Sequence, residues 1–267
     1  MMVDLYHFHQ GTTPLLFSIP HAGTAVPDAL FDRFSEPARA LPDTDWHVPL
    51  LYDFVKDLGP SVLQAKMSRY VIDLNRPPDD ESLYPGQATT GLCPDILFDG
   101  RPLYEAGQSL SDDEIEERRE QYWRPYHDRL AGELARLRSA FGYALLYDAH
   151  SIASRVPRLF DGRLPDLNLG TAHGTSCAPE IESSIAAILR QSAFSSAVNG
   201  RFMGGYITRH YGDPAGGIHA VQMEIAQESY MDEVEGFPYN EAKANQLKPV
   251  LREVLTTLLD RGASVIG

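Results

Sequence analysis

Short apolar runs alternate along the chain with longer segments in which apolar residues recur every three or four positions. The short runs are typical of buried strands, and the longer spacing is typical of amphipathic helices. The expected strands cover residues 15–19, 61–65, 70–74, 143–147 and 220–225. Strands that alternate with helices in this way predict an α/β fold with a parallel or mixed sheet.

The expected helices cover residues 48–58, 179–191 and 241–261, and a longer one, with a bend at Pro125, covers 111–139. Ser111 and Glu114 have the capping-box spacing that opens a helix. Residues 77–107 are rich in Pro, Gly and Asp, and a loop of this length is more often functional than accidental. At roughly 100–200 residues per domain, the chain forms one large domain or two small ones, and we treat residues 1–267 as a single domain.

The composition is that of an ordinary globular protein, with 43% hydrophobic and 22% charged residues. A net charge of −14 disfavours nucleic acid and anionic membranes as partners, but it does not exclude a small acidic substrate. Two cysteines, Cys93 and Cys177, suggest a reducing compartment, not a disulfide scaffold. Neither a signal peptide nor an apolar stretch of ~20 residues is visible, so we expect a cytoplasmic protein. The oligomeric state stays open.

Histidines follow two of the expected strands. His21 comes after 15–19 and His150 after 143–147, while Glu224 lies within 220–225. Because ligands bind at the carboxyl ends of strands in open α/β sheets, these residues can meet at one edge. Two imidazoles and a carboxylate often bind catalytic zinc, and a further carboxylate can act as general base. We predict His21 and His150 as metal ligands and Glu224 as the base; the alternative for each histidine is a hydrogen-bonded structural residue.

The third metal ligand has two candidates. Position 24 is Thr, so a glutamate three residues after His21 is absent. Asp43 and Asp45 are the next acidic residues, although either could instead cap a helix that starts near position 46. We predict Asp45 as the ligand, Asp43 as the cap or a neighbour of the site, and His47 as a neighbour, not a ligand.

Arginines near an expected strand end indicate an acidic substrate. In the segment SRYVIDLNRP, Arg69 and Arg76 flank an apolar run, and Asn75 precedes the second arginine. Guanidinium groups bind carboxylates bidentately, although one of the pair could form a structural ion pair with Asp73. Arg209, in a Gly/Tyr-rich segment, is a third candidate, and its alternative is a solvated loop.

Other nucleophiles lack a supporting signature. His173, Ser176 and Cys177 lie close together, but no nucleophile elbow or catalytic-cysteine motif surrounds them. We expect residues 166–176 to form a loop on the substrate side and Cys177 to be a small buried residue.

The motifs SIPHAG, SRYVIDLNRP, LYDAHS, DLNLGT, GGYITRHYG and VQMEIAQESYM occur in this order and together resemble the N-formylglutamate amidohydrolase family over about residues 13–260. The resemblance implies a three-layer α/β/α fold with a mixed central sheet, similar to that of zinc carboxypeptidases. It also implies hydrolysis of N-formyl-L-glutamate to formate and L-glutamate, the last step of one histidine-degradation route. The cofactor that the resemblance implies is one divalent metal ion, with zinc as the first candidate.

The resemblance also implies roles for single residues: metal ligation by His21 and His150, a base at Glu224, polarisation of the scissile carbonyl by Arg69, and carboxylate binding by Asn75 and Arg76, with Arg209 as a further candidate. Thr24 departs from the wider superfamily, which has a glutamate ligand there, and this leaves Asp45 as the predicted third ligand. Two main alternatives stay open: a metal-dependent deacylase of another N-acyl amino acid, and a non-catalytic protein that binds acidic amino acids. A base such as Glu224 argues against the second.

Overall fold

The computed structural model describes residues 4–83 and 86–265. A seven-stranded sheet has the order β1-β3-β2-β4-β7-β5-β6. The strands are β1 (Tyr6–His9), β2 (Leu15–Ile19), β3 (Ser61–Ala65), β4 (Ala144–Ile152), β5 (Leu167–Gly170), β6 (Ser196–Val198) and β7 (Ile218–Ala226). β3, β2, β4 and β7 run parallel to one another, whereas β1 is antiparallel to β3 and β5 to β7. The sheet is therefore mixed, as the sequence predicted.

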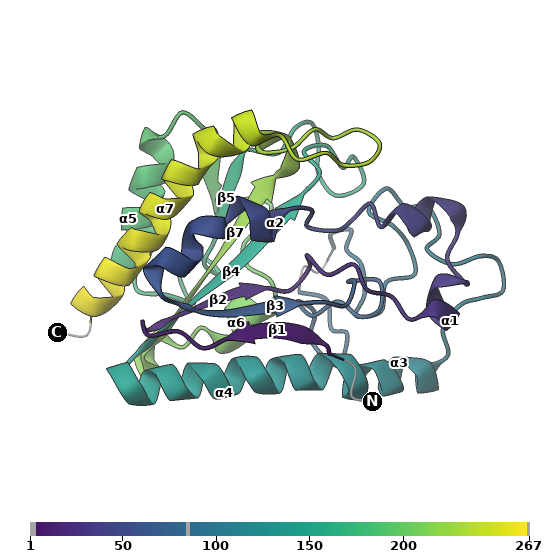
Figure 1. Cartoon of the computed structure of the whole chain (residues 1–267), viewed down its shortest axis with the longest axis horizontal. Helices are drawn as coiled ribbons and strands as arrows, with labels where there is room; N and C mark the ends of the chain where they lie inside the picture. The colour runs from purple at the N-terminus through teal and green to yellow at the C-terminus, as the bar shows by residue number, and fades with distance from the viewer. Residues whose placement is uncertain (1–3, 84–85, 266–267) are drawn as a thin grey trace.

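Helices cover both faces of this sheet. They are α1 (Asp28–Phe31), α2 (Val48–Leu51), α3 (Asp112–Arg118), α4 (Arg124–Phe141), α5 (Pro179–Gln191), α6 (Tyr206–Tyr211) and α7 (Glu241–Ser264), with 3₁₀ turns η1 (Glu36–Ala40), η2 (Asp53–Leu58), η4 (Pro214–Gly216) and η5 (Gln227–Ser229), and a π turn η3 (Arg119–Trp123). In Figure 1, α5 and α7 lie on one side of the sheet and α4 on the other. This is the three-layer α/β/α architecture that the resemblance implied.

Two apolar clusters fill the spaces between the layers. One joins Phe17, Tyr147 and Ile225 of the sheet to α5 and α7. The other joins Leu16 and Leu146 to α4 and α6. Successive side chains of a strand point to opposite faces, so burial of one set fixes the direction of the other.

This alternation gives the polar residues of β4 and β7 a common direction. Tyr147 and Ala149 pack in the cluster beneath α5 and α7, so Asp148 and His150 point to the opposite face. Glu224 precedes Ile225 of the same cluster and therefore shares the face of His150. Residues far apart in the sequence thus meet at one end of one face.

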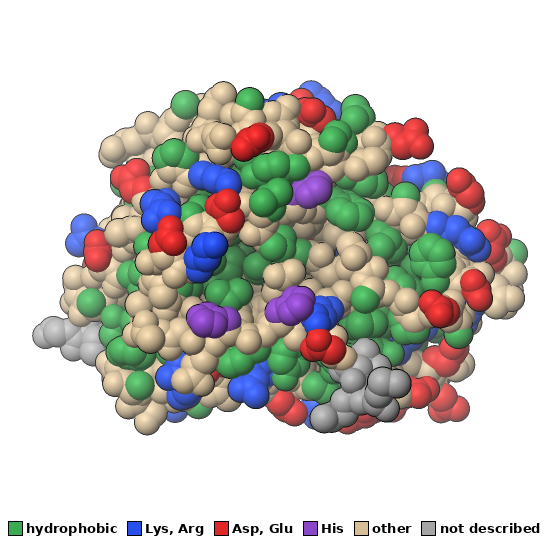
Figure 2. Space-filling model, in the orientation of Figure 1, with side chains coloured by type: hydrophobic (Ala, Val, Ile, Leu, Met, Phe, Trp, Pro, Cys, Tyr) green, Lys and Arg blue, Asp and Glu red, His purple; other side chains and the backbone are tan. Residues whose placement is uncertain are grey.

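Among the described residues, acidic and basic side chains are interspersed on the surface, without a large patch of one sign on the face shown in Figure 2. Figure 2 shows acidic and basic side chains interspersed on one face, with hydrophobic groups between them. None of the helices in the described part of the chain is long and apolar enough to cross a membrane.

The expected strand over residues 70–74 is wrong. These residues form turns, and their apolar side chains are buried by loops and helices, not by strand pairing. Tyr70 and Val71 pack with Phe34 and Leu103, whereas Ile72 packs on the side of α4. Burial alone therefore produced the strand-like run.

Three further elements differ from expectation. The helix predicted over 48–58 is divided at Tyr52 into α2 and the 3₁₀ turn η2. The strand predicted over 143–147 continues to residue 152, so the polar residues after position 147 lie within it. The helix predicted to bend at Pro125 instead contains the π turn η3, in which the N–H of Arg124 donates to the carbonyl of Arg119. Proline lacks an N–H and clashes with the carbonyl four residues earlier, and the wider turn accommodates both effects. In Figure 1, α3 and α4 run in line, and the predicted capping box opens α3.

Candidate active site

The candidate site lies at the carboxyl ends of the four parallel strands. His21 follows β2, Arg69 follows β3, and His150 and Glu224 lie near the ends of β4 and β7. His150 and Glu224 are direct partners across these two strands. The prediction that sequence-distant residues meet at this edge is confirmed.

His21, Asp45 and His150 form a buried group whose possible ligand atoms all lie within 4.8 Å of one another. The Nδ1 atom of His150 lies 3.1 Å from Asp45 Oδ2, and Nδ1 of His21 lies 3.9 Å from the same oxygen. Both imidazoles therefore turn Nδ1 toward Asp45. In the described ranges 4–83 and 86–265, no other group of His, Cys, Asp and Glu has the proximity that a metal ion requires.

A carboxylate holds the far side of each imidazole. His21 Nε2 lies 2.7 Å from Asp73 Oδ1, and His150 Nε2 lies 2.8 Å from Asp148 Oδ2. A proton on each Nε2 would be donated to its carboxylate and would leave Nδ1 as a ligand atom, which is the usual arrangement of metal-binding histidines. Burial lowers the pKa of His21. For His150, burial acts in the same direction, but Asp148 and Asp45 hold its pKa well above the usual range.

Asp45 comes from a separate loop that backbone hydrogen bonds fix in place. Its N–H donates to the carbonyl of His21 over 3.1 Å. The carbonyl groups on either side of it, at positions 44 and 46, accept from Gln227 Nε2 at 2.9 Å and from the Tyr230 hydroxyl at 2.6 Å. The buried Oδ1 of Asp45 has no hydrogen-bond partner among the described residues. An unpaired buried carboxylate oxygen is costly, so this donor set fits a divalent cation.

The neighbours of Asp45 are engaged elsewhere. Asp43 Oδ2 accepts from the N–H of Phe98 at 2.9 Å. His47 Nε2 donates to the carbonyl of Phe237 at 2.7 Å. The helix near this segment begins at Val48, and no side chain caps it, so the capping alternative for both aspartates is wrong. Of the two candidates, Asp45 is the one that the fold brings to the histidines.

Glu224 is buried beside this group, with 7% of its surface exposed. Burial raises the pKa of Glu224 to about 8, although the charge of His150 acts in the opposite direction. Gln222 Nε2 donates to Glu224 Oε2 at 3.3 Å, and Gln222 Oε1 accepts from the N–H of Gly205 at 2.7 Å. A carboxyl group whose pKa lies near neutrality is suited both to take and to return a proton.

Arg69 is buried between the acids of the site and an aromatic ring. It donates to Asp73 Oδ2 at 2.7 Å, and its Nη1 lies 3.9 Å from Asp45 Oδ1. Its Cζ atom lies 4.5 Å from the centre of the Phe98 ring. The ion pair with Asp73 that the sequence left as an alternative is therefore present, yet Arg69 also lines the cavity next to the histidines.

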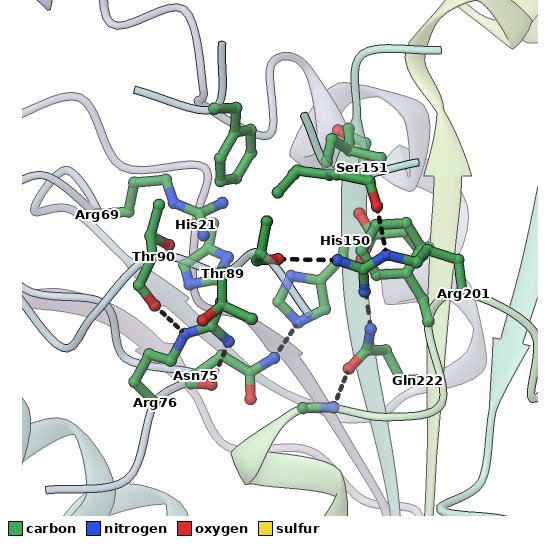
Figure 3. A pocket seen from close by; sticks show the side chains of 17 residues that line it. His21, Arg69, Asn75, Arg76, Thr89, Thr90, His150, Ser151, Arg201 and Gln222 are labelled. Carbon is green, nitrogen blue, oxygen red and sulfur yellow. Dashed lines mark hydrogen bonds between the residues drawn. The ribbon is translucent and has the colours of Figure 1, made fainter. Parts of the chain in front are cut away.

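A cavity of about 60 Å³ opens beside His21 and His150, and Figure 3 shows its lining residues. Three of these residues are arginines, namely Arg69, Arg76 and Arg201. Arg76 Nε donates to the carbonyl of Thr90 at 2.8 Å, and no described carboxylate lies within ion-pair distance of its guanidinium. A cation that faces a cavity with backbone carbonyls as its partners is well placed to bind an anionic ligand.

Asn75 lines the same cavity, but its amide is already engaged. Its Oδ1 accepts from the N–H of Ile207 at 2.8 Å, while Nδ2 donates to Asp148 Oδ2 at 3.3 Å and lies 2.9 Å from His150 Nε2. Gly205 packs against this amide, where a Cβ atom would come within 2.4 Å of Nδ2. Asn75 thus positions His150 and its carboxylate.

Other sequence candidates lie away from the cavity. Arg209 belongs to α6, not to a loop; its Nε donates to the carbonyl of Gly204 at 2.8 Å, and it is not among the described residues that line the cavity. Residues 167–170 form β5, and no described residue of 166–176 lines the cavity, so the expected substrate-side loop is wrong. Cys177 is buried as predicted, and burial raises its pKa to about 12.

Sequence reasoning missed two side chains that hold candidate site residues, one behind His150 and one beside Glu224. Asp148 and Gln222 each stand two residues before a predicted site residue on the same strand, a spacing that places both on one face. The two-residue spacing of side chains on one face of a strand could have identified both Asp148 and Gln222. Arg201 carries no such signal, because it lies in an irregular segment after β6.

Comparisons with known proteins point to one family. A family model described as N-formylglutamate amidohydrolase matches residues 13–231. The chain is 56% identical over 263 residues to an N-formylglutamate deformylase of Pseudomonas putida and 53% identical over 262 residues to one of Pseudomonas aeruginosa PAO1; each match covers 98% of both chains. The crystal structure of an N-formylglutamate amidohydrolase from Ralstonia eutropha JMP134 is 27% identical, with 98% of both chains covered and a TM-score of 0.81.

Proposed function

The chain belongs to the N-formylglutamate amidohydrolase family, and from this premise we propose that it hydrolyses N-formyl-L-glutamate to formate and L-glutamate. The resemblance drawn from the sequence motifs is thereby confirmed. The observation that carries the proposed reaction is the buried group of His21, Asp45 and His150 with Glu224 directly beside it. Such a group supplies a cation site and a general base within one cavity.

We assign one divalent cation, zinc in first place, to the Nδ1 atoms of His21 and His150 and to the carboxylate of Asp45. Asp45 Oδ1, which accepts no hydrogen bond from the described residues, and the carboxylates behind both imidazoles support this assignment. When bound, the cation supplies Lewis acidity, which acidifies water and polarises a carbonyl oxygen.

Glu224 serves as base and then as acid. It takes a proton from the attacking water as the new C–O bond to the formyl carbon forms, and it returns this proton to the glutamate nitrogen as the C–N bond breaks. A pKa of about 8, raised by burial, keeps both transfers within reach at neutral pH. Gln222 holds the carboxylate through its bond to Oε2.

The arginines of the cavity act on the substrate's oxygens. Arg69 donates to the formyl oxygen, where negative charge develops during attack, and this kind of stabilisation is usually a large part of the rate. Arg76 binds one carboxylate of the glutamyl part, a pairing that its guanidinium can make bidentately. Asn75 holds Asp148, the carboxylate behind His150, through a hydrogen bond of 3.3 Å.

A formate-release assay with measured metal content tests this function. We expect release of formate from N-formylglutamate, little cleavage of N-acetyl- or N-carbamoylglutamate, and about one divalent ion per chain. Removal of the ion with a chelator should abolish turnover, and addition of zinc should restore it. If metal-replete protein released no formate, the proposed function would be wrong.

Asp45→Ala and Asp43→Ala form a matched pair for the cation site. Asp45→Ala should lose the metal, because it removes the carboxylate that faces both histidines. Asp43→Ala should keep the metal and lose only the stability that comes from its bond to Phe98. Loss of metal from the Asp43 variant alone would exclude Asp45 as the ligand.

A further inference from the structure

Three arginines hold three consecutive carbonyl groups at the edge of the cavity. Arg201, Arg158 and Arg76 donate, in that order, to the carbonyls of residues 88–90, one each, over 3.1, 2.9 and 2.8 Å. Residues 88–90, Arg76 and Arg201 all line the cavity, whereas Arg158 is not among its described lining residues. In Figure 3, Arg76 and Arg201 appear on opposite sides of the His150 ring.

The contents of the cavity must change when substrate binds. Arg76 and Arg201 already donate to backbone carbonyls, so a substrate carboxylate that binds either arginine has to displace one of these acceptors. Residues 88–90 belong to the 77–107 stretch, whose described part (77–83 and 86–107) contains no helix or strand longer than an isolated bridge. A carboxylate is a stronger acceptor for a guanidinium than a neutral carbonyl is. Exchange of carbonyl for carboxylate is therefore favourable at both cavity arginines.

We propose that Arg201 binds the γ-carboxylate of the substrate while Arg76 binds the α-carboxylate, so that the cavity recognises a dicarboxylate with one arginine at each end. This inference rests on the proposed function. In the described structure, the carbonyls of residues 88 and 90 occupy the acceptor positions that the two carboxylates take.

The assignment of each arginine follows from its contacts. The α-carboxylate is attached to the carbon that bears the scissile nitrogen, so it must lie close to the candidate metal ligands. Arg76 directly follows Asn75, whose amide lies 2.9 Å from His150 Nε2. Arg201 instead donates to the carbonyl of Leu159 at 2.7 Å and to that of Ala88, both of which belong to loops.

The test compares Arg201→Gln with Arg158→Gln on two substrates, N-formylglutamate and its γ-amide N-formylglutamine. Arg201→Gln should lower kcat/KM for N-formylglutamate by roughly 30-fold, the lower end of the loss seen when one partner of a charge pair is removed, because Arg201 is only half-buried. It should change kcat/KM for N-formylglutamine less than about threefold, because that substrate lacks the charge that Arg201 binds. Arg158→Gln is the control for a loosened loop, since Arg158 holds the same segment, and it should affect both substrates equally and weakly.

Arg201→Lys and the α-amide N-formylisoglutamine complete the experiment. Arg201→Lys keeps the charge and should retain part of the preference for N-formylglutamate over N-formylglutamine. On N-formylisoglutamine, Arg201→Gln should cost as much as on N-formylglutamate. Equal losses on both amides, or a loss confined to the α-carboxylate, would overturn this inference while the proposed function stood. A wild-type protein that releases no formate would instead overturn the proposed function itself.

Discussion

The two ends of the cavity are held in place by different means. At the metal end, His21 and His150 belong to the central strands or directly follow them, and buried carboxylates fix both rings. At the arginine end, Arg76 and Arg201 come from irregular segments and hold the backbone carbonyls of residues 88–90. The candidate metal ligands are thus held in place before the substrate arrives, whereas the arginines make contacts that the substrate can replace.

This difference matches what each end has to do. Groups that stabilise developing charge work best when their geometry is fixed in advance, because no reorganisation is then needed during the reaction. Groups that admit and release a charged molecule have to exchange partners, and loops carry such motions. We therefore expect changes at the metal end to act on turnover and changes at the arginine end to act on substrate affinity and selectivity.

The largest effect should come from Glu224→Gln at the metal end. Glutamine keeps the shape but cannot accept the proton of water, and acid–base groups contribute typically ~10²–10⁴-fold each. Because Glu224 serves both proton transfers, kcat should fall by about three orders of magnitude or more. Metal content and KM should stay near wild type, as measured by metal analysis and initial rates. A variant that loses its metal would show that Glu224 is a ligand instead.

Arg76→Gln should have the next largest effect, and this effect should fall on substrate affinity, not on turnover. Loss of its charge should weaken binding of N-formylglutamate by roughly a hundredfold, seen mainly in KM. The α-amide N-formylisoglutamine is the control, because it lacks the carboxylate assigned to Arg76 and should suffer little. A fall in kcat with unchanged KM would instead mean that Arg76 belongs functionally to the metal end.

Asp73→Asn and Asp148→Asn test whether the carboxylates behind the imidazoles hold the metal end together. Each should reduce metal affinity about 10–100-fold, the usual cost of removing such a partner. Competition with a chromogenic chelator measures this affinity directly. Ser18→Ala, which removes a hydroxyl that donates to Asp148 Oδ1 and also contacts the Tyr126 hydroxyl, is the matched control and should have a smaller effect. Unchanged affinity in both asparagine variants would show that the rings need no carboxylate.

The smallest effect concerns the support of the arginine end. His127 Nε2 donates to the carbonyl of Leu74, and its Nδ1 accepts from the Tyr211 hydroxyl, both over 2.9 Å. Burial lowers the pKa of His127 to about 3. The pKa of His127 in the unfolded chain is near 6.5. Between about pH 6.5 and pH 3, the unfolded chain therefore binds one more proton than the folded chain, and the contribution of His127 to stability falls as the pH falls.

His127→Gln should therefore flatten the acid side of the stability profile. The slope of the unfolding free energy against pH should decrease by up to about 1.4 kcal/mol per pH unit over that window. Urea unfolding of both proteins at pH 7, 6 and 5 measures the difference. Parallel profiles would show that His127 binds protons equally in the folded and the unfolded chain.

Much of the fold could be predicted from the sequence because burial leaves a local pattern. β2, β3 and α5 have the expected bounds, since each is an apolar run or helical repeat bounded by turn residues. β5 and β6 were missed, because four and three residues are too short to establish a period. Residues 70–74 were misassigned because an apolar run reports burial, not strand pairing.

The site also contains residues that a local sequence pattern could predict and residues that it could not. His21, His150 and Glu224 were predictable because they stand at strand ends or in strands, where the topology fixes their meeting point. Asp45 was preferred over Asp43 without a local reason, and only the tertiary contacts of its loop explain why it meets the histidines. Arg76 was a candidate from the sequence, but the contacts of the three arginines with residues 88–90 were beyond prediction, because they depend on how separate loops fold against one another.

The tethers of Asp45 have a consequence for biosynthesis. Its loop is held by Gln227 and Tyr230, which lie far later in the chain than either histidine. At a synthesis rate of about 5–20 residues per second, the ribosome needs roughly 4–15 seconds to proceed from His150 to Gln227. A nascent chain that already displays both histidines therefore still lacks the contacts that aim Asp45 at them. The proposed cation can therefore meet its complete ligand set only after the last strand and the residues that follow it have been made.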